Sequence, residues 1–306
     1  MLIRIVKKLY TRYTQFKRHE LVKNSLFTLC RYVYMNIKIN VVKKPFIVHW
    51  YNNIQYYLKK GDSSLISNYY FKIFDYEETL FLLHYLNSKD LFIDVGANQG
   101  LYTLATSGII GCDTVAIEPV PETFRRLKLN IELNKLKNVQ LVQKIISNKK
   151  SLLNILVEGG ELNKVVLNKT SKKTLKAESI SLDELIDPKT DVSCIKIDVE
   201  GFEKMVLEGA ERILKSVALN VILIELNNSN LYYDYEENEI IDILKKHSFK
   251  PYEYDPINKN LIELKIKNKE SFNSIYIKDI DIAVKRFEEK KVQITDKEIL
   301  IKKRKI

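Results

Sequence analysis

Residues 91–134 decide the fold; they read LFIDVGANQGLYTLATSGIIGCDTVAIEPVPETFRRLKLNIELN. The stretch opens with a short apolar run, 91–95, which carries one acid, Asp94, near its end. The glycine-rich turn GANQG follows at 96–100, and apolar residues at helical spacing come next. A buried strand that ends in such a turn and re-enters a helix predicts a unit that binds a nucleotide.

A second strand, 114–117, ends at Glu118, 18 residues after Gly100. An acid at that spacing is where a ribose presents its two hydroxyls. Dinucleotide-binding turns have the pattern Gly-x-Gly-x-x-Gly, whereas Gly96 and Gly100 are four residues apart. Asp94 would repel a pyrophosphate but suits a cofactor with an ammonium and a sulfonium group. The pattern therefore favours S-adenosylmethionine.

Five segments together resemble the FkbM family of methyltransferases. They are FIDVGANQG (92–100), AIEPVPETFRRLKLNIELN (116–134), ISLDELI (180–186), IKIDVEGFEKMVLEGAERIL (195–214) and VILIEL (221–226). The resemblance covers roughly residues 75–280. It implies a Rossmann-like α/β fold of class I, with a mostly parallel seven-stranded sheet and helices on both faces.

The expected cofactor site follows the ends of these strands, because open α/β sheets bind ligands there. The turn at 96–100 should hold the methionine end of the cofactor, Glu118 the ribose, and Ile146-Ser147 should lie beside the adenine. The full set of predicted cofactor-binding residues is Asp94, Gly96, Ala97, Asn98, Gly100, Tyr102, Glu118, Pro119, Ile146, Ser147 and Asp198.

Three acids are the predicted catalytic residues. Asp198 ends strand 193–198, Glu200 comes two residues later, and Glu225 stands near the end of strand 219–226. Asp198 and Glu225 are candidates for the base that removes a hydroxyl proton. The three carboxylates could also hold a divalent metal, which the sequence does not require. Glu200 has alternatives as an acid at a helix N-terminus or as an ion-pair partner of Lys196, which is expected to be structural.

The predicted function is O-methyl transfer from S-adenosylmethionine to a hydroxyl of a small molecule or glycan, which is what the resemblance implies. Two alternatives come from other classes. One is a nucleic-acid methyltransferase recruited by basic chain ends; no Pro-Pro-Tyr/Phe-type motif for a flipped base supports it. The other is a non-catalytic protein that keeps the fold. The acceptor, metal dependence and oligomeric state stay open.

Charge is concentrated at the two ends of the chain. Residues 1–44 hold eleven Lys or Arg against one acid, and residues 285–306 hold nine against four. The remainder is net acidic, so no nucleic-acid partner is expected, because its footprint should line the catalytic face. The basic N-terminus predicts a peripheral contact with an anionic membrane.

Three domains are expected: a basic helical and hairpin extension (1–74), the methyltransferase domain (75–290) and a basic tail (291–306). Within them, 4–36 predicts one or two helices, 46–58 a hairpin, and 149–177, with Gly159-Gly160, a loop-bearing insertion. A helix is expected at 202–214. With no signal-peptide pattern, no membrane-spanning run and three cysteines that lack ligand spacing, the chain is expected to be cytoplasmic, with reduced thiols.

Overall fold

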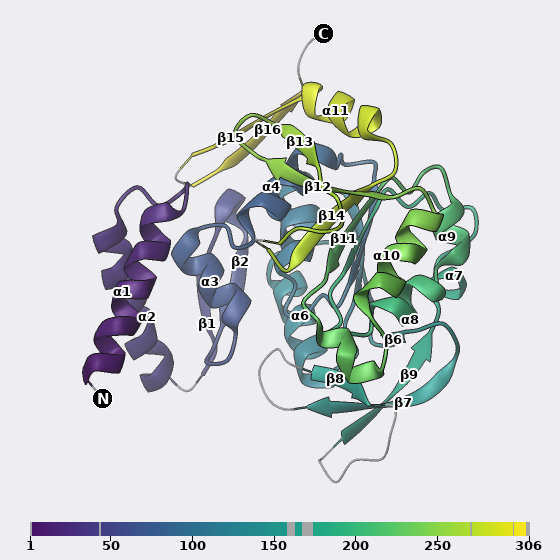
Figure 1. Ribbon diagram of the computed structural model, residues 1–306. Coiled ribbons are helices and arrows are strands. Elements are labelled where there is room, and N and C mark those ends of the chain that lie inside the picture. Colours follow the sequence, from purple (N-terminus) through teal and green to yellow (C-terminus); the bar gives the residue numbers. More distant parts are fainter. Residues whose placement is uncertain are drawn as a thin grey trace.

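The computed structural model describes residues 2–42, 44–157, 163–166, 174–269, 271–295 and 297–303. Its centre is an eight-stranded sheet with the order β13-β12-β14-β11-β10-β3-β4-β5 (Figure 1). The strands are β3 (Leu91–Val95), β4 (Asp113–Ile117), β5 (Val139–Val142), β10 (Cys194–Ile197), β11 (Val221–Glu225), β12 (Lys250–Asp255), β13 (Asn260–Glu263) and β14 (Asn273–Ile277).

Strands β11, β10, β3, β4 and β5 pair in parallel. Beyond β11 the sheet continues with β14, β12 and β13, each of which pairs antiparallel with the strand before it. The expected α/β fold is confirmed, with seven expected strands and β13 added at the edge. The parallel strands are continuous apolar runs because both of their faces are covered. Their register places Lys196 beside Asp94 on neighbouring strands.

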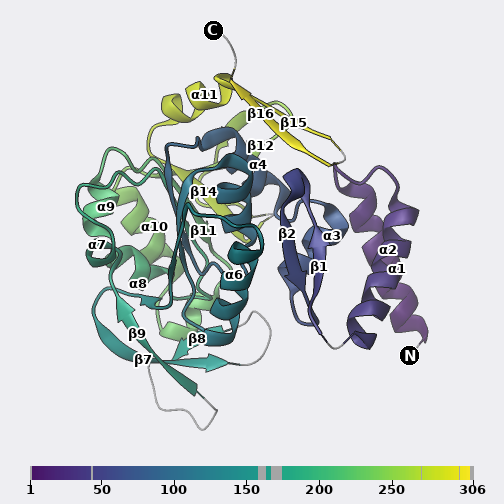
Figure 2. The ribbon, with the colours of Figure 1, turned by 180° about the vertical axis from the view of Figure 1, so that it is seen from behind.

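Helices cover both faces of the sheet (Figures 1 and 2). Ile93 and Val95 of β3 pack toward one side, with α8, α9 and α10, whereas Phe92 packs toward the other, with α4 and α11. This alternation follows from the two-residue period of a strand. The helices of this domain are α4 (Tyr76–Tyr85), α5 (Leu101–Thr103), the π-helix η2 (Leu104–Ile110), α6 (Pro121–Leu133), α7 (Leu182–Leu185), α8 (Glu203–Glu208), α9 (Glu211–Lys215), η3 (Ser229–Tyr233), α10 (Glu237–Lys246) and α11 (Ile280–Glu288).

The single helix predicted at 202–214 is two helices, α8 and α9. The helix is interrupted at Gly209, where an added Cβ would lie 2.1 Å from the backbone oxygen of Ser147. This glycine therefore lets the helix pair pack directly on the backbone of Ser147, which follows β6.

The loop-bearing insertion expected at 149–177 contains strands that the sequence analysis did not predict. Its described parts form a second, four-stranded sheet with the order β6-β9-β7-β8. The strands are β6 (Ile145–Ile146), β7 (Ser151–Val157), β8 (Asn163–Val166) and β9 (Thr174–Ile180). The apolar runs of these strands are short and lie between polar residues, so hydrophobic periodicity did not predict them. Gly159-Gly160 lies outside the described residues.

The N-terminal extension has the two helices and the hairpin that the sequence predicts. It consists of α1 (Leu2–Arg18), α2 (Ser25–Val41), β1 (Phe46–His49), η1 (Tyr51–Asn53), β2 (Gln55–Leu58) and α3 (Ser63–Phe71). Asn130 and Asn134 of α6 accept hydrogen bonds from the backbone of β2, at Tyr57 N and Gln55 N, both 2.8 Å long. Arg126 of α6 also forms a buried ion pair with Asp62. The extension is thus fastened to the sheet domain through α6.

The C-terminal segment is a hairpin and not the expected tail. Strands β15 (Lys290–Ile294) and β16 (Ile299–Lys303) pair antiparallel and reach toward the extension (Figures 1 and 2). Asn52 of η1 holds the hairpin: its N–H donates to Lys297 O (3.1 Å), and its side chain bonds the backbone of Ile299 in both directions. Domain limits at residues 74 and 290 stay a prediction.

Candidate active site

A cavity of about 300 Å³ opens at the carboxyl ends of β3, β4, β10 and β11. This is where an open α/β sheet binds its ligand. Eight of the predicted site residues line it: Gly96, Asn98, Glu118, Pro119, Ile146, Asp198, Glu200 and Glu225.

The turn after β3 is locked between two neighbouring strands. Gly96 N and Ala97 N both donate to Ile117 O, at 3.0 and 2.9 Å. Gly96 has a φ of 82°, and an added Cβ would lie 1.8 Å from Asp198 O. Only glycine fits this position, because a side chain would collide with the backbone of β10 and strain the turn.

Glu118 stands at the end of β4 and is 6% exposed. Its two carboxylate oxygens accept hydrogen bonds from Asn98 N (3.1 Å) and Val120 N (3.0 Å). Burial raises the pKa of Glu118 to about 7, against the opposing effect of these two bonds. A carboxylate has about four acceptor positions, so both oxygens keep capacity for a ligand hydroxyl.

Asn98 occupies the middle of the turn with a φ of 50°, a conformation that asparagine tolerates better than most residues. Its side-chain oxygen Oδ1 is buried and has no hydrogen-bond partner among the described residues. Buried acceptors without a partner are rare in proteins and point to a missing donor. The cavity thus offers an acceptor to a ligand that carries N–H or O–H groups.

Five predicted cofactor residues are buried and do not line the cavity: Asp94, Ala97, Gly100, Tyr102 and Ser147. Asp94 is 1% exposed and accepts a 2.6 Å hydrogen bond from Thr103 Oγ1. Burial raises its pKa, opposed by the charge of Lys196. The Tyr102 hydroxyl donates to Asp75, which itself lines the cavity (3.0 Å).

Lys196 connects this buried layer with the cavity. Its ammonium is 2.7 Å from Asp198 Oδ2 and 4.7 Å from the centre of the Tyr102 ring. Burial would lower its pKa, but the charges of Asp198 and Asp94 outweigh burial and raise it. Lys196 therefore remains protonated and fixes the Asp198 carboxylate, as its expected structural role requires.

Glu200 enters the cavity from a strained turn between β10 and α8. Its φ is 55°, and Gly201 follows with a φ of 98°. The buried Glu203 carboxylate accepts from Gly201 N (3.0 Å) and Val199 N (3.3 Å), which holds this turn in shape. Glu200 lies ahead of α8, which begins at Glu203, and it lines the cavity wall.

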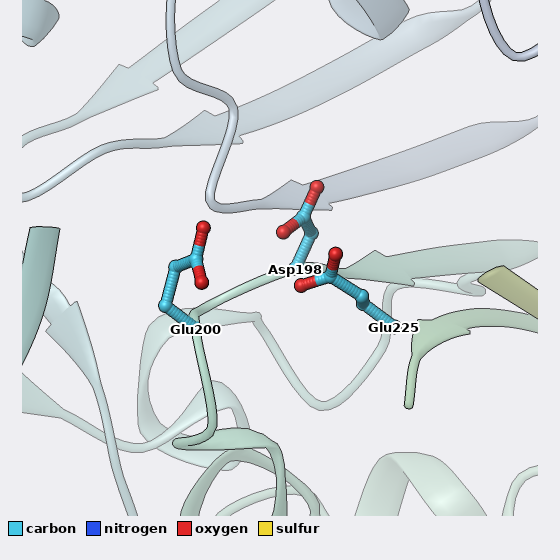
Figure 3. Close-up of side chains that lie close together, drawn as sticks. All are labelled: Asp198, Glu200 and Glu225. Carbon is cyan, nitrogen blue, oxygen red and sulfur yellow. The ribbon is translucent and has the colours of Figure 1, made fainter. Parts of the chain in front are cut away.

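Asp198, Glu200 and Glu225 lie close together, as Figure 3 shows. One carboxylate oxygen from each lies within 4.8 Å of the others. Burial, then the charges of Asp198 and Glu200, raises the pKa of Glu225 to about 9. Without a cation, Glu225 is therefore protonated at neutral pH. The oxygen ligands of the cluster also suit Mg²⁺.

Sequence reasoning missed three parts of the cavity wall. Phe74 and Asp75 come from the end of the N-terminal extension, Ile155 and Val165 from the second sheet, and the segment 271–273 from the loop before β14. Ile155 and Val165 belong to an apolar cluster with Val120, Ile145 and Phe202. No motif marks these residues, because long-range packing brings them to the site.

The methyltransferase FkbM domain model matches residues 94–251, just over half of the chain. No curated protein matches the sequence.

Solved structures with a similar arrangement are remote. A precorrin-6y C5,15-methyltransferase from Geobacter metallireducens is 14% identical, with a TM-score of 0.39 over 67% of this chain and 86% of that one. An rRNA methylase from Streptococcus thermophilus is 12% identical (TM-score 0.38; 65% and 91%). A SAM-dependent O-methyltransferase from Thermotoga maritima is 12% identical (TM-score 0.40; 76% and 76%). These similarities are too weak to carry an argument about the acceptor.

Proposed function

The chain belongs to the FkbM methyltransferase family, and we propose that it transfers a methyl group from S-adenosylmethionine to a hydroxyl of a small-molecule or glycan acceptor. The observation that carries this proposal is the convergence of Glu118 and the three-acid cluster on one cavity. It supplies acceptors for a cationic cofactor and a base for a hydroxyl proton in the same space.

The residues present fit S-adenosylmethionine. The free acceptor capacity of Glu118 matches the two ribose hydroxyls, and the unpartnered Asn98 Oδ1 matches the ammonium group. The apolar cluster around Ile145 and Phe202 provides a dry wall for the adenine. Among the described lining residues, acids outnumber the one cation, Lys144, which suits a sulfonium.

When bound, the cofactor supplies an electrophilic methyl group, and the protein must align the acceptor and remove its proton. We assign proton removal to Asp198, because Lys196 fixes its carboxylate in the cavity. Glu225 is protonated at neutral pH, so it donates a hydrogen bond that orients the acceptor oxygen. Glu200 lines the same cavity beside these two acids.

The experiment that tests this proposal is methyl transfer from labelled S-adenosylmethionine to separated cell fractions: glycans, lipids, small molecules and nucleic acids. Label should enter the glycan or small-molecule fraction, and an Asp198→Asn variant should lose it. Label in nucleic acid would support the alternative acceptor. That alternative conflicts with an acid-lined cavity, which repels phosphates. Cofactor binding without transfer to any fraction would support a non-catalytic protein.

A divalent cation on the three-acid cluster is the alternative to this arrangement, in which Asp198 and Glu225 would be metal ligands and not base and hydrogen-bond donor. Mg²⁺ binding would require ionised Glu225, so it should displace a proton and strengthen as the pH rises toward 9. Thermal unfolding with and without Mg²⁺ at several pH values checks this. Equal melting temperatures throughout would mean that the cluster works without magnesium.

We also propose a peripheral contact with anionic membranes through the N-terminal extension. On α1, Phe16 is fully buried and is therefore not available to a membrane. Instead α2 presents an exposed apolar stripe at helical spacing: Leu26, Val33, Ile37 and Val41. Residues 1–44 carry ten net positive charges, and each positive charge near an anionic surface contributes about 1 kcal/mol. None of the described helices is both long and apolar enough to cross a membrane.

Sedimentation with anionic vesicles at low salt tests the contact. Deleting the extension would expose the core residues that it covers, so full-length variants are better. Ile37→Glu should abolish pelleting, whereas Ile262→Glu, an equally exposed change on β13, should not. Equal pelleting of both variants would contradict the proposal.

A further inference from the structure

A second cavity, of about 380 Å³, lies where the N-terminal extension meets the C-terminal hairpin. We call it the extension pocket; it is lined by residues of α2, the β1–β2 hairpin, α3 and the turn between β15 and β16. The methyl-transfer cavity does not share a residue with it. The two are nonetheless adjacent in sequence, since Ser64 and Asp75 line one cavity while Tyr69 and Lys72 line the other.

Three cations line the extension pocket: Arg31, Lys72 and Lys297. No acid is among its described lining residues, and no described acid forms an ion pair with Arg31 or Lys297. Concave surfaces lined by one sign of charge attract ions of the opposite sign. The charge of this pocket therefore selects an anion.

The cations are held in place by the protein. Arg31 donates to Tyr69 O (3.1 Å), and its guanidinium lies 4.4 Å from the centre of the Tyr69 ring. Lys297 is positioned through its backbone, because Asn52 clamps the hairpin at that residue. Tertiary contacts thus bring Arg31 and Lys297 to the same pocket, and the protein holds both of them in place.

Aromatic rings form much of the remaining wall: Trp50, Tyr51, Tyr56 and Tyr69. The Trp50 ring is partly exposed, and its Nε1 donates to Lys72 O (2.5 Å). This bond fixes the orientation of the ring at the pocket wall. Aromatic faces with polar edges suit ligands that have an apolar face and a rim of hydroxyls.

Asn68 supplies the observation that points to a bound ligand. It lines the pocket, is 1% exposed, and its Nδ2 has no hydrogen-bond partner. Its Oδ1 accepts from Phe74 N (3.1 Å), which fixes the orientation of the amide. The nearby Tyr56 hydroxyl donates to Leu65 O (3.3 Å). A buried donor without an acceptor is costly unless a ligand supplies one.

We propose that the extension pocket binds a phosphorylated sugar, either free or carried on a nucleotide. The phosphate would lie between Arg31 and Lys297, the sugar ring against Trp50, and a hydroxyl or phosphate oxygen would accept from Asn68 Nδ2. This inference goes beyond the proposed methyl transfer and does not depend on it. The site can serve a protein whose acceptor is itself a sugar.

Trp50 makes the test specific, because it is the only tryptophan in the chain. Tryptophan fluorescence of the full-length protein should change saturably with glucose 1-phosphate or UDP-glucose. The ligand that binds more tightly shows whether the site takes a free sugar phosphate or one carried on a nucleotide. Glucose alone and inorganic phosphate alone should each bind at least about tenfold more weakly, since each meets half of the site. Phosphate binding as tight as glucose 1-phosphate would overturn the sugar assignment.

Variants then locate the binding site. Lys297→Glu should weaken binding about tenfold or more, while Lys302→Glu, exposed on the same hairpin, should not. Asn68→Asp keeps the acceptor for Phe74 N but removes the free donor, and should also weaken binding about tenfold. If the Asn68→Asp variant fails to fold, the comparison of Lys297→Glu with Lys302→Glu still tests the proposal. Equal affinities in the two lysine variants, or no saturable change with either ligand, would overturn the proposal.

Glu118→Ala, a change in the methyl-transfer cavity, separates the two proposals. It should leave the tryptophan titration unchanged while it weakens S-adenosylmethionine binding. Loss of sugar phosphate binding in this variant would mean that Trp50 reports on the other cavity, and would overturn the assignment.

Discussion

The two cavities of this protein carry opposite charge although one short segment, residues 63–75, contributes to both. The methyl-transfer cavity is lined by acids at strand ends, and the extension pocket by cations from helices and loops. The acidic lining of the first cavity comes from the strand ends of the central sheet, whereas the cationic lining of the second comes from the N-terminal extension and the C-terminal hairpin. Substitutions that weaken binding in one cavity should therefore leave binding in the other cavity unchanged.

The largest expected effect concerns the joint between the two regions. Arg126→Ala leaves Asp62 buried without its partner and should lower the free energy of unfolding by about 3–5 kcal/mol. Chemical denaturation followed by circular dichroism measures it. Arg125→Ala, on the exposed side of the same helix, should change stability little. Equal losses in both variants would show that the Asp62–Arg126 pair does not fasten the extension.

The next effect concerns catalysis. Asp198→Asn keeps the shape of the side chain but removes the proposed base, so turnover should fall by roughly 10²-fold or more. Binding of S-adenosylmethionine, followed by calorimetry, should remain largely intact. Asp113→Asn, an exposed change at the opposite end of the sheet, is the matched control. Normal turnover of Asp198→Asn would transfer the role of base to Glu225.

A smaller effect concerns the cofactor. Glu118→Ala removes the acceptor proposed for the ribose hydroxyls and should weaken S-adenosylmethionine binding by about 1.5–3 kcal/mol. Calorimetry of the folded variant measures this, with Glu122→Ala on the exposed face of α6 as the control. Unchanged affinity would remove Glu118 from the cofactor site.

The last effect is a pH dependence of stability, which is spread over several pH units. Burial and two neighbouring carboxylates raise the pKa of Glu225 from 4.5 to about 9 in the folded protein. The folded state therefore holds a proton that the unfolded state has lost, and this contribution to stability decreases as the pH rises from 4.5 to 9. Glu225→Gln cannot lose that proton. Its melting temperature relative to the unchanged protein should rise across this range; a constant difference would contradict the raised pKa.

Much of the methyl-transfer cavity is predictable from local patterns. The order of strand, glycine turn and acid places Gly96, Asn98 and Glu118 correctly along its edge, because strand ends and turns follow from neighbouring residues. Asp94 and Tyr102 are also where the pattern puts them, yet they are buried and do not line the cavity. The pattern gives their position in the chain but not their depth below the cavity surface.

The second sheet and the C-terminal hairpin were not predictable in the same way. Their strands are short and polar on one face, and β7 pairs with β9 across a stretch of chain rich in lysine. Strand pairing of this kind depends on what the strand packs against, more than on its own composition. Ile155 and Val165 acquire their role only when the sheet folds over Phe202.

By itself, the sequence determined the fold class, the family, the glycine turn and the acids at the strand ends, since each depends on residues close together in the chain. Only the tertiary structure decided that Lys196 pairs with Asp198 and that Glu225 gains a raised pKa, because burial and neighbouring charge set both. It also decided that Arg31, Asn68 and Lys297 share a pocket. Contacts across more than 200 residues leave no local pattern by which a sequence could reveal them.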